Sequence, residues 1–443
     1  MIAFVPIART TFDIPFAKEQ ADLARAAVRR TGLEIVEIAD LLTDLDAVRG
    51  AIGALAGAPL DLVVVLQATF ADSTMVTVLA EAIDAPLLLW ALPEPQVGGR
   101  LRLNSLCGVN LAAFALKRRG KVYDYVYAAP GDDAVQATIM SMAGAGRALR
   151  ALRGARIGVI GQHPDGFEPC AYDADRLRAA LGVEVMPYDL DSIFGQADAI
   201  PSERVEAQYA RVAAQLANLG ELNPVSVRGT LSFHEAMHDV VTADGLQGAA
   251  VRCWPETFLK RDCAVCAASS MLSEAGIPAS CEADVNGTVT GLILQTISSQ
   301  PAFSADLVAA DIAAQTVVFW HCGLAPLSMC DPDFQPRGAL HSNRQRPLLM
   351  EFPLKPGRAT VARLTQAGAD GGYRLAIGRG EMLAAPMQFT GTSGVFRFDS
   401  PLEAVLDTIM REGLDHHYTI AYGDHAEALR QFAAMAGLPV ILL

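Results

Sequence analysis

Long hydrophobic runs are missing from this sequence of 443 residues. Its longest apolar stretches, such as residues 62–66 and 86–92, are far shorter than the roughly 20 residues that a helix needs to cross a membrane. The first residues have no basic lead and no apolar region of signal-peptide length. These absences argue against a membrane-embedded or exported chain. We expect a soluble, cytoplasmic protein that opens on a strand at residues 2–6.

Basic residues are scarce in comparison with acidic ones. The chain has 35 Lys and Arg against 49 Asp and Glu, which gives a formal net charge of −14. Such a charge repels nucleic acid and anionic membranes, so neither is an expected partner. Carboxylates that can hold a cation are plentiful, and the charge balance favours a small neutral substrate together with a metal.

Cysteines are few and scattered. The eight Cys of this large chain indicate buried reduced thiols rather than a disulfide framework. The one CxxC, Cys263 to Cys266, lies in a helical pattern without a second pair, so it gives little support to a zinc or redox role. Low-complexity tracts are also absent, and the composition is that of a globular protein.

Short apolar runs alternate with longer amphipathic stretches over most of the chain, which indicates parallel sheets covered by helices. Beyond about residue 332 the pattern changes to strands joined by Gly and Pro turns, as in a small antiparallel barrel or sandwich. The sequence therefore predicts an α/β protein with two Rossmann-like parallel-sheet domains and a smaller C-terminal antiparallel β domain. The expected boundaries are 1–152, 153–332 and 333–443.

Polar side chains follow three predicted strands of the central domain. Glu256 comes after the strand at 249–254, and His321 lies at the tip of the strand at 316–320. The strand at 279–283 runs into Glu282, Asp284 and Asn286 before a helix. Functional groups of parallel sheets collect at such strand ends. Carboxylates with an imidazole suit Mn²⁺ or Mg²⁺. The alternative is that each acidic residue caps the following helix, and Asp284 is a fair capping candidate.

Two adjacent histidines, His416 and His417, open a predicted strand in the last domain. Successive side chains of a strand point to opposite faces, so only one of the pair can face a metal, while the other looks away or toward the substrate. Tyr418 and Ile420 suit the core and share a face with His416. That leaves His417 facing the crevice, although an exposed histidine pair can also be incidental.

Three segments together resemble the short, fucose-isomerase-like branch of the L-fucose/L-arabinose isomerase superfamily. They are Trp254-Pro-Glu256, Cys281-Glu-Ala-Asp-Val-Asn-Gly287 and the terminal His416-His-Tyr-x-x-x-Tyr-Gly-Asp424. Their order and spacing agree with that family over essentially the whole chain. The resemblance implies that Glu256 and Asp284 are metal ligands and that His417 completes the site, with His416 as the near alternative. His321 is similar in placement to a further imidazole ligand of the arabinose branch.

The resemblance also implies the reaction, a metal-dependent aldose–ketose isomerisation of a monosaccharide through an enediolate. Mn²⁺ or Mg²⁺ would stabilise that intermediate, with Glu256 and Asp284 moving protons. A homo-oligomer with shared active sites is implied too. Asn286 and His416 are candidates to bind the sugar, as is Arg100, or Arg102, on a loop that could cover the site or could be an ordinary solvated loop. The chain is shorter than the fucose and arabinose enzymes, so its sugar remains open. An aldolase, an epimerase, a sulfosugar isomerase and a non-catalytic sugar-binding protein are the alternatives.

Overall fold

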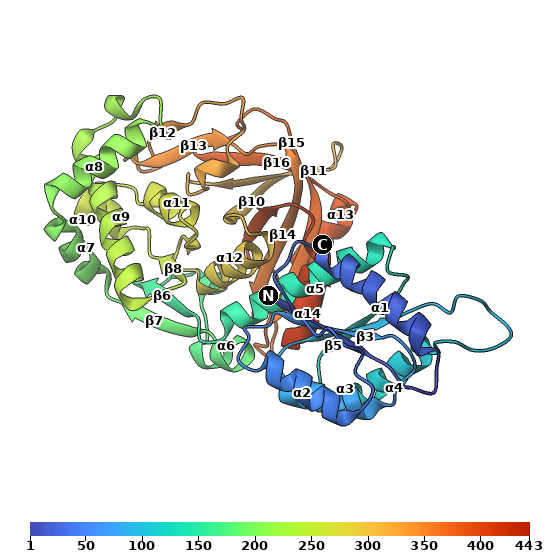
Figure 1. Ribbon diagram of the computed structural model, residues 1–443. Coiled ribbons are helices and arrows are strands. Elements are labelled where there is room, and N and C mark those ends of the chain that lie inside the picture. Colours follow the sequence, from blue (N-terminus) through green and yellow to red (C-terminus); the bar gives the residue numbers. More distant parts are fainter. The chain divides into compact units, whose positions relative to one another are not determined.

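The computed structural model describes residues 1–443 and divides into two compact units. The first unit comprises residues 1–150 with 427–437, and the second comprises residues 151–426 with 438–443. Figure 1 shows the helices and strands of both along the chain. None of the helices combines the length and the apolar character of a transmembrane span.

The first unit is built on a parallel sheet in the order β2-β1-β3-β4-β5. Its strands β1, β3 and β4 are buried along their whole length, which explains why they appear in the sequence as unbroken apolar runs. The side chains of Asp13, Asp44 and Asp72 accept backbone hydrogen bonds at the starts of the first three helices. The strands are β1 (Ile2–Ile7), β2 (Ile35–Glu37), β3 (Leu62–Gln67), β4 (Leu87–Ala91) and β5 (Tyr123–Tyr127), and the helices are α1 (Ile14–Arg29), α2 (Leu45–Leu55), α3 (Ser73–Ala82), α4 (Ser105–Arg118), α5 (Asp133–Leu152) and α14 (Ala426–Ala436).

The second unit contains a shorter parallel sheet in the order β7-β6-β8-β9. Its strands are β6 (Arg156–Ile160), β7 (Glu184–Tyr188), β8 (Gly248–Val251) and β9 (Ala279–Ser280). The helices between and after them are α6 (Ala174–Leu181), α7 (Leu190–Ala199), α8 (Ser202–Ala213), α9 (Pro224–Asp244), α10 (Glu256–Arg261), α11 (Cys266–Glu274) and α12 (Val285–Ser298).

The same unit contains an antiparallel barrel. Strands follow one another in the order β16-β11-β10-β17-β14-β15, and β15 pairs back to β16, which closes the ring. Strands β12, β13 and β18 extend it at its margins. The strands are β10 (Phe303–Asp311), β11 (Thr316–His321), β12 (Arg337–Ala339), β13 (Leu349–Pro353), β14 (Gly357–Thr365), β15 (Arg374–Leu383), β16 (Thr392–Phe398), β17 (His417–Tyr422) and β18 (Val440–Leu442), with α13 (Leu402–Glu412) before β17.

Helix α12 joins the barrel to the parallel sheet. It packs against β14 and β17 of the barrel and against β8 of the sheet. Most of its residues are buried, because it has a sheet on more than one side. This helix begins at Asp284, so the start of α12 lies where the two sheets meet.

The predicted fold class is confirmed: two parallel sheets with helices precede an antiparallel β structure. One strand was wrongly placed. The strand at 316–320 belongs to the barrel, where it pairs with β10 and β16, and not to the central parallel sheet. Strand β10, which pairs with this strand in the barrel, was not predicted.

The expectation of reduced thiols is wrong for Cys253 and Cys281, which form a disulfide with a Cα–Cα distance of 5.9 Å. These cysteines follow the neighbouring parallel strands β8 and β9, which pair in register and so bring their ends together.

Candidate metal centre

The site begins in the turn that follows β9. Glu282 and Ala283 have φ angles of 58° and 54°, in the left-handed region that non-glycine residues seldom adopt. Such backbone costs about 1–3 kcal/mol per residue and collects at functional sites. The turn directs Glu282 into the unit and then starts α12. Asp284 caps this helix by accepting the backbone N–H of Gly287 at 2.9 Å, which confirms the capping alternative.

A second carboxylate comes from the barrel. Asp306 of β10 lies directly opposite His417 of β17 in the antiparallel register. Its Oδ1 atom is 3.3 Å from His417 Nε2. Both atoms are buried, and neither has a hydrogen-bond partner. Buried polar atoms normally have partners, so this facing pair indicates a position for a cation.

His417 is held from its other side by Asp284. The carboxylate lies 2.9 Å from Nδ1, and both side chains are almost completely buried. A carboxylate on one imidazole nitrogen fixes the ring and leaves the other nitrogen free to bind a metal. Asp284 thus aims Nε2 of His417 at Asp306 and Glu282.

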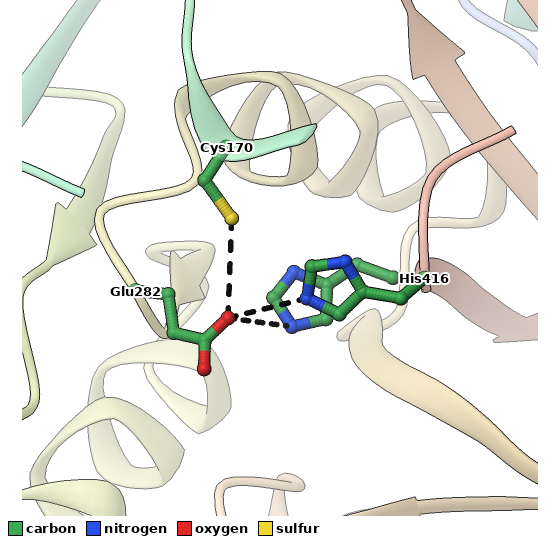
Figure 2. Close-up of side chains that lie close together, drawn as sticks. Cys170, Glu282 and His416 are labelled. Atoms are coloured by element: carbon green, nitrogen blue, oxygen red, sulfur yellow. Dashed lines mark hydrogen bonds and ion pairs between the residues drawn. The ribbon is translucent and has the colours of Figure 1, made fainter. Parts of the chain in front are cut away.

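Glu282 meets three further groups at its Oε2 atom, and Figure 2 shows it pointing toward Cys170 and His416. The distances are 3.2 Å to His416 Nε2, 3.7 Å to His417 Nε2 and 3.9 Å to Cys170 Sγ. Its Oε1 atom accepts a hydrogen bond from Trp254 Nε1 at 3.2 Å. The carboxylate is therefore fixed at one oxygen, while the other faces the histidines.

His321 completes the cluster from the end of β11. Its Nδ1 atom accepts the backbone N–H of Cys322 at 2.8 Å, and its ring centre lies 5.5 Å from that of His417. Three sets of donor atoms lie close enough together to share a cation, but one of them, Cys281, His321 and Cys322, includes a cysteine of the disulfide, which leaves two. One set is Asp306, His321 and His417, and the other is Cys170, Glu282, His416 and His417. His417 belongs to both.

The charges of this cluster favour ionised carboxylates. Burial alone would raise the pKa of Glu282, but the hydrogen bond with His416 and the charges of His417 and His321 outweigh burial and lower it. Burial also opposes the charge of Asp284, yet Arg363 and His417 hold its pKa well below the usual range. Ionised carboxylates are the form that binds a hard cation.

Arg363 of β14 contacts the site through Asp284. Its guanidinium contacts Asp284 at 2.5 Å and 3.1 Å, Asp415 at 2.7 Å and the carbonyl oxygen of Pro169 at 3.1 Å. The side chain is fully buried. The arginine neutralises Asp284 and so holds in place the carboxylate that orients His417.

The predicted site residues are only partly brought together. Asp284, His321, His416 and His417 lie in the cluster. Glu256 does not join it, since its carboxylate pairs with Arg252 at 2.7 Å at the start of α10.

Two predicted substrate-binding residues lie elsewhere. Asn286 is buried, accepts a hydrogen bond from Tyr373 at 3.3 Å, and lines a cavity of about 420 Å³ that Glu282 does not line. Arg100 lies in the first unit on an exposed segment before α4. The binding roles of both residues stay predictions.

Both histidines of the pair belong to the cluster. Both His416 and His417 approach Glu282 Oε2. Strand alternation does not apply to His416, because β17 begins at His417 and His416 lies in the bend before it. Which of the two binds a metal stays a prediction, and His417 is the one that lies opposite Asp306 in the strand register.

Sequence reasoning noticed Glu282 but gave it no role, and it missed Asp306, Cys170 and Arg363. A signal for Asp306 exists in the alternation of Phe303-Ser-Ala-Asp-Leu307, which follows Pro301 and is typical of a half-buried strand. No local signal marks Cys170 or Arg363, because Glu282 and Asp284, which they contact in the site, are 112 and 79 residues away in the chain.

Comparison with known proteins gives matches over both ends of the chain. Residues 3–153 match the family described as fucose/sulfoquinovose isomerase, N-terminal domain. Residues 321–443 match the family described as L-fucose isomerase, C-terminal domain.

Whole-length relatives carry one name, sulfoquinovose isomerase. Those from Priestia aryabhattai and Alkalicoccus urumqiensis are each 30% identical to this chain, and the match covers 99% of this chain and 98% of each relative. One from Clostridium sp. (strain MSTE9) is 31% identical over the same shares of both chains.

Proposed function

This chain belongs to the fucose/sulfoquinovose isomerase family and is an aldose–ketose sugar isomerase. We propose that it works with a divalent cation held by His417, which both donor sets share, together with Asp306 from one set and Glu282 from the other. The observation that carries the proposal is the buried pair of atoms His417 Nε2 and Asp306 Oδ1, which face each other at 3.3 Å without hydrogen-bond partners. Two carboxylates and an imidazole suit Mn²⁺, with Mg²⁺ as the alternative.

A cation bound there would supply Lewis-acid stabilisation of the negative charge that develops on sugar oxygens as hydrogen moves between two adjacent carbons. The surrounding side chains orient the sugar and move protons. His416 is the most exposed member of the cluster, with 36% of its side chain accessible, so it can reach the substrate. Glu282 is the candidate base, because its lowered pKa keeps the carboxylate ionised, which is the form that can accept a proton, and its Oε2 atom faces the histidines.

This ligand set differs in part from the one that the resemblance implies. Asp284 acts here by orienting His417, since Arg363, the N–H of Gly287 and His417 already occupy its two oxygens. Glu256 remains a predicted ligand from the resemblance, but its ion pair with Arg252 favours Glu282 in that role.

The name of the relatives suggests the substrate to test first. Sulfoquinovose is a hexose that carries a sulfonate, so it is an anion. We propose a sulfonated hexose for this chain, in place of the neutral substrate that the net charge favoured.

Chelation should abolish the isomerisation. After dialysis against a strong chelator, we expect less than about one hundredth of the original rate, because the charge that stabilises the reaction is lost. Adding Mn²⁺ should restore the rate and raise the melting temperature, since an ion that binds only the folded state stabilises it. Product formation is followed by NMR. Full activity in the metal-free protein would overturn the proposal.

Two glutamate variants compare the structural ligand set with the set implied by resemblance. Glu282→Gln and Glu256→Gln each remove one charge and keep the side-chain volume. We expect Glu282→Gln to lose bound Mn²⁺ and Glu256→Gln to keep most of it, measured by metal analysis after gel filtration. If Glu256→Gln loses Mn²⁺ and Glu282→Gln keeps it, Glu256 is the metal ligand.

A homo-oligomer with active sites shared between subunits is also proposed. Helix α4 of the first unit exposes Leu106, Leu111 and Phe114, the last with 64% of its side chain accessible. Exposed apolar side chains on one helix suit a protein interface. We expect light scattering to give a multiple of 47.0 kDa, and Arg100→Gln to weaken sugar binding. A fully active monomer would refute this arrangement.

A further inference from the structure

Arg344 is an arginine beside the metal centre whose charge no carboxylate balances. Its guanidinium lies over the rings of Trp254 and Phe258, 4.8 Å and 5.1 Å from their centres, and its side chain forms no hydrogen bond or ion pair. Other arginines of this region are neutralised, namely Arg252 by Glu256, Arg346 by Asp262, and Arg363 by Asp284 and Asp415.

The unpaired guanidinium and the metal centre line the same cavity. This cavity has a volume of about 180 Å³, and Glu282, Asp306 and His321 line it together with Arg344 and Trp254. The indole of Trp254 connects the two parts, because its Nε1 donates to Glu282 at 3.2 Å while its ring lies against Arg344. A molecule in this cavity can therefore meet the carboxylates at one end and the guanidinium at the other.

The turn that carries Arg344 is held in place. The backbone N–H groups of Arg344 and Gln345 both donate to the carbonyl of His341, at 3.2 Å and 2.7 Å. His341 is buried, and its ring packs on Phe258 with the ring centres 5.2 Å apart. Phe258 thus supports both the turn and the guanidinium, so the arginine is positioned before any ligand arrives, which lowers the entropic cost of binding.

The position of the Arg344 guanidinium over two aromatic rings determines which kind of ligand it can bind. Contacts with aromatic rings use the face of the guanidinium and leave its N–H edge free for a planar or tetrahedral oxyanion. The protein as a whole carries a charge of −14 and repels anions at a distance. An anionic substrate therefore needs a local positive group, and an unbalanced arginine provides one.

We propose that Arg344 binds the anionic group of the sugar substrate, a sulfonate or a phosphate, at the end remote from the reacting carbons, and so sets the enzyme's preference for charged over neutral sugars. This inference rests on the proposed function, because it places the reacting end of the sugar at the metal centre.

The test compares Arg344→Gln and Arg344→Lys with Arg346→Gln, a neighbouring arginine that Asp262 already neutralises. Each Mn²⁺-loaded protein is given a sulfonated hexose, a hexose phosphate and the unsubstituted hexose. Binding is measured by calorimetry and turnover by NMR. A charge-assisted hydrogen-bond pair is worth a roughly 10- to 100-fold change in affinity.

We expect Arg344→Gln to weaken binding of the preferred anion by that factor and to raise KM with little change in kcat. Arg344→Lys should recover part of the loss, while the neutral hexose and Arg346→Gln should be unaffected. The tighter of the two anionic sugars in wild-type binding shows whether Arg344 takes a sulfonate or a phosphate. Wild-type binding of neither anion, or an equal effect of Arg344→Gln on the neutral sugar, would overturn the inference. Arg344-dependent binding without ketose formation would instead overturn the proposed function and leave the anion site standing.

Discussion

Replacing His417 with alanine is expected to lower kcat/KM by at least about 100-fold, because even residues that only orient a metal ligand cost 10- to 100-fold when removed. His417 belongs to both sets of donor atoms in the centre, and Asp284 fixes its ring. His416→Ala should act mainly on KM. That side chain is partly exposed and contacts only Glu282 within the cluster by hydrogen bonding.

The comparison needs metal content and kinetics on both variants. We expect His417→Ala to lose bound Mn²⁺ and His416→Ala to retain it. His417 is buried in β17, so the metal-free melting temperatures of all three proteins are needed to separate lost ligation from lost folding. If His416→Ala loses the metal and His417→Ala keeps it, the ligand role belongs to His416.

Arg363→Met should lower the free energy of unfolding by about 3–5 kcal/mol, the usual cost of removing one partner from a buried ion pair. The substitution leaves Asp284 and Asp415 buried without the arginine that neutralises them. Urea denaturation measures the change. Arg358→Met is the matched control, since it lies on the same strand but pairs with Asp399 near the surface, where a pair is worth about 1 kcal/mol or less.

The stability difference between wild type and Arg363→Met should depend on pH. Arg363 and His417 lower the pKa of Asp284 in the folded protein, so the stabilisation that this carboxylate provides is present above its unfolded pKa of about 3.9 and is lost as the pH falls toward its folded pKa. The wild type should therefore exceed Arg363→Met in its free energy of unfolding by a large amount at neutral pH and by a small amount in acid. If Arg363→Met and Arg358→Met lower the free energy of unfolding equally, the buried ion pairs of Arg363 do not stabilise the fold as proposed.

The features that could be predicted from the sequence are those with a local signature. Buried parallel strands appear as apolar runs, so the βαβ order was readable, and Asp284 precedes a helix in a typical capping position. His417 could be placed at the start of a strand because the residues that follow it are typical of a buried strand. Each of these inferences needs only a few adjacent residues.

The missed features depend on pairing between distant parts of the chain. Asp306 enters the site because β10 pairs with β17, more than a hundred residues later. Arg363 and Asp284 meet because α12 packs on β14. Cys253 and Cys281 bond because β8 and β9 are neighbours in the sheet. Arg344 can be identified as unpaired only once every possible carboxylate partner has been placed.

The position of β17 between β10 and β14 has a consequence for how this protein is made. A ribosome releases β10 and β14 well before β17, and until His417 emerges the barrel has a gap with two unpaired strand edges. Such edges readily pair with other chains. Asp306 and Glu282 are then already present but have no imidazole from β17 beside them. In a growing chain the proposed metal site can therefore be completed, and the two exposed strand edges covered, only when this single late strand is inserted.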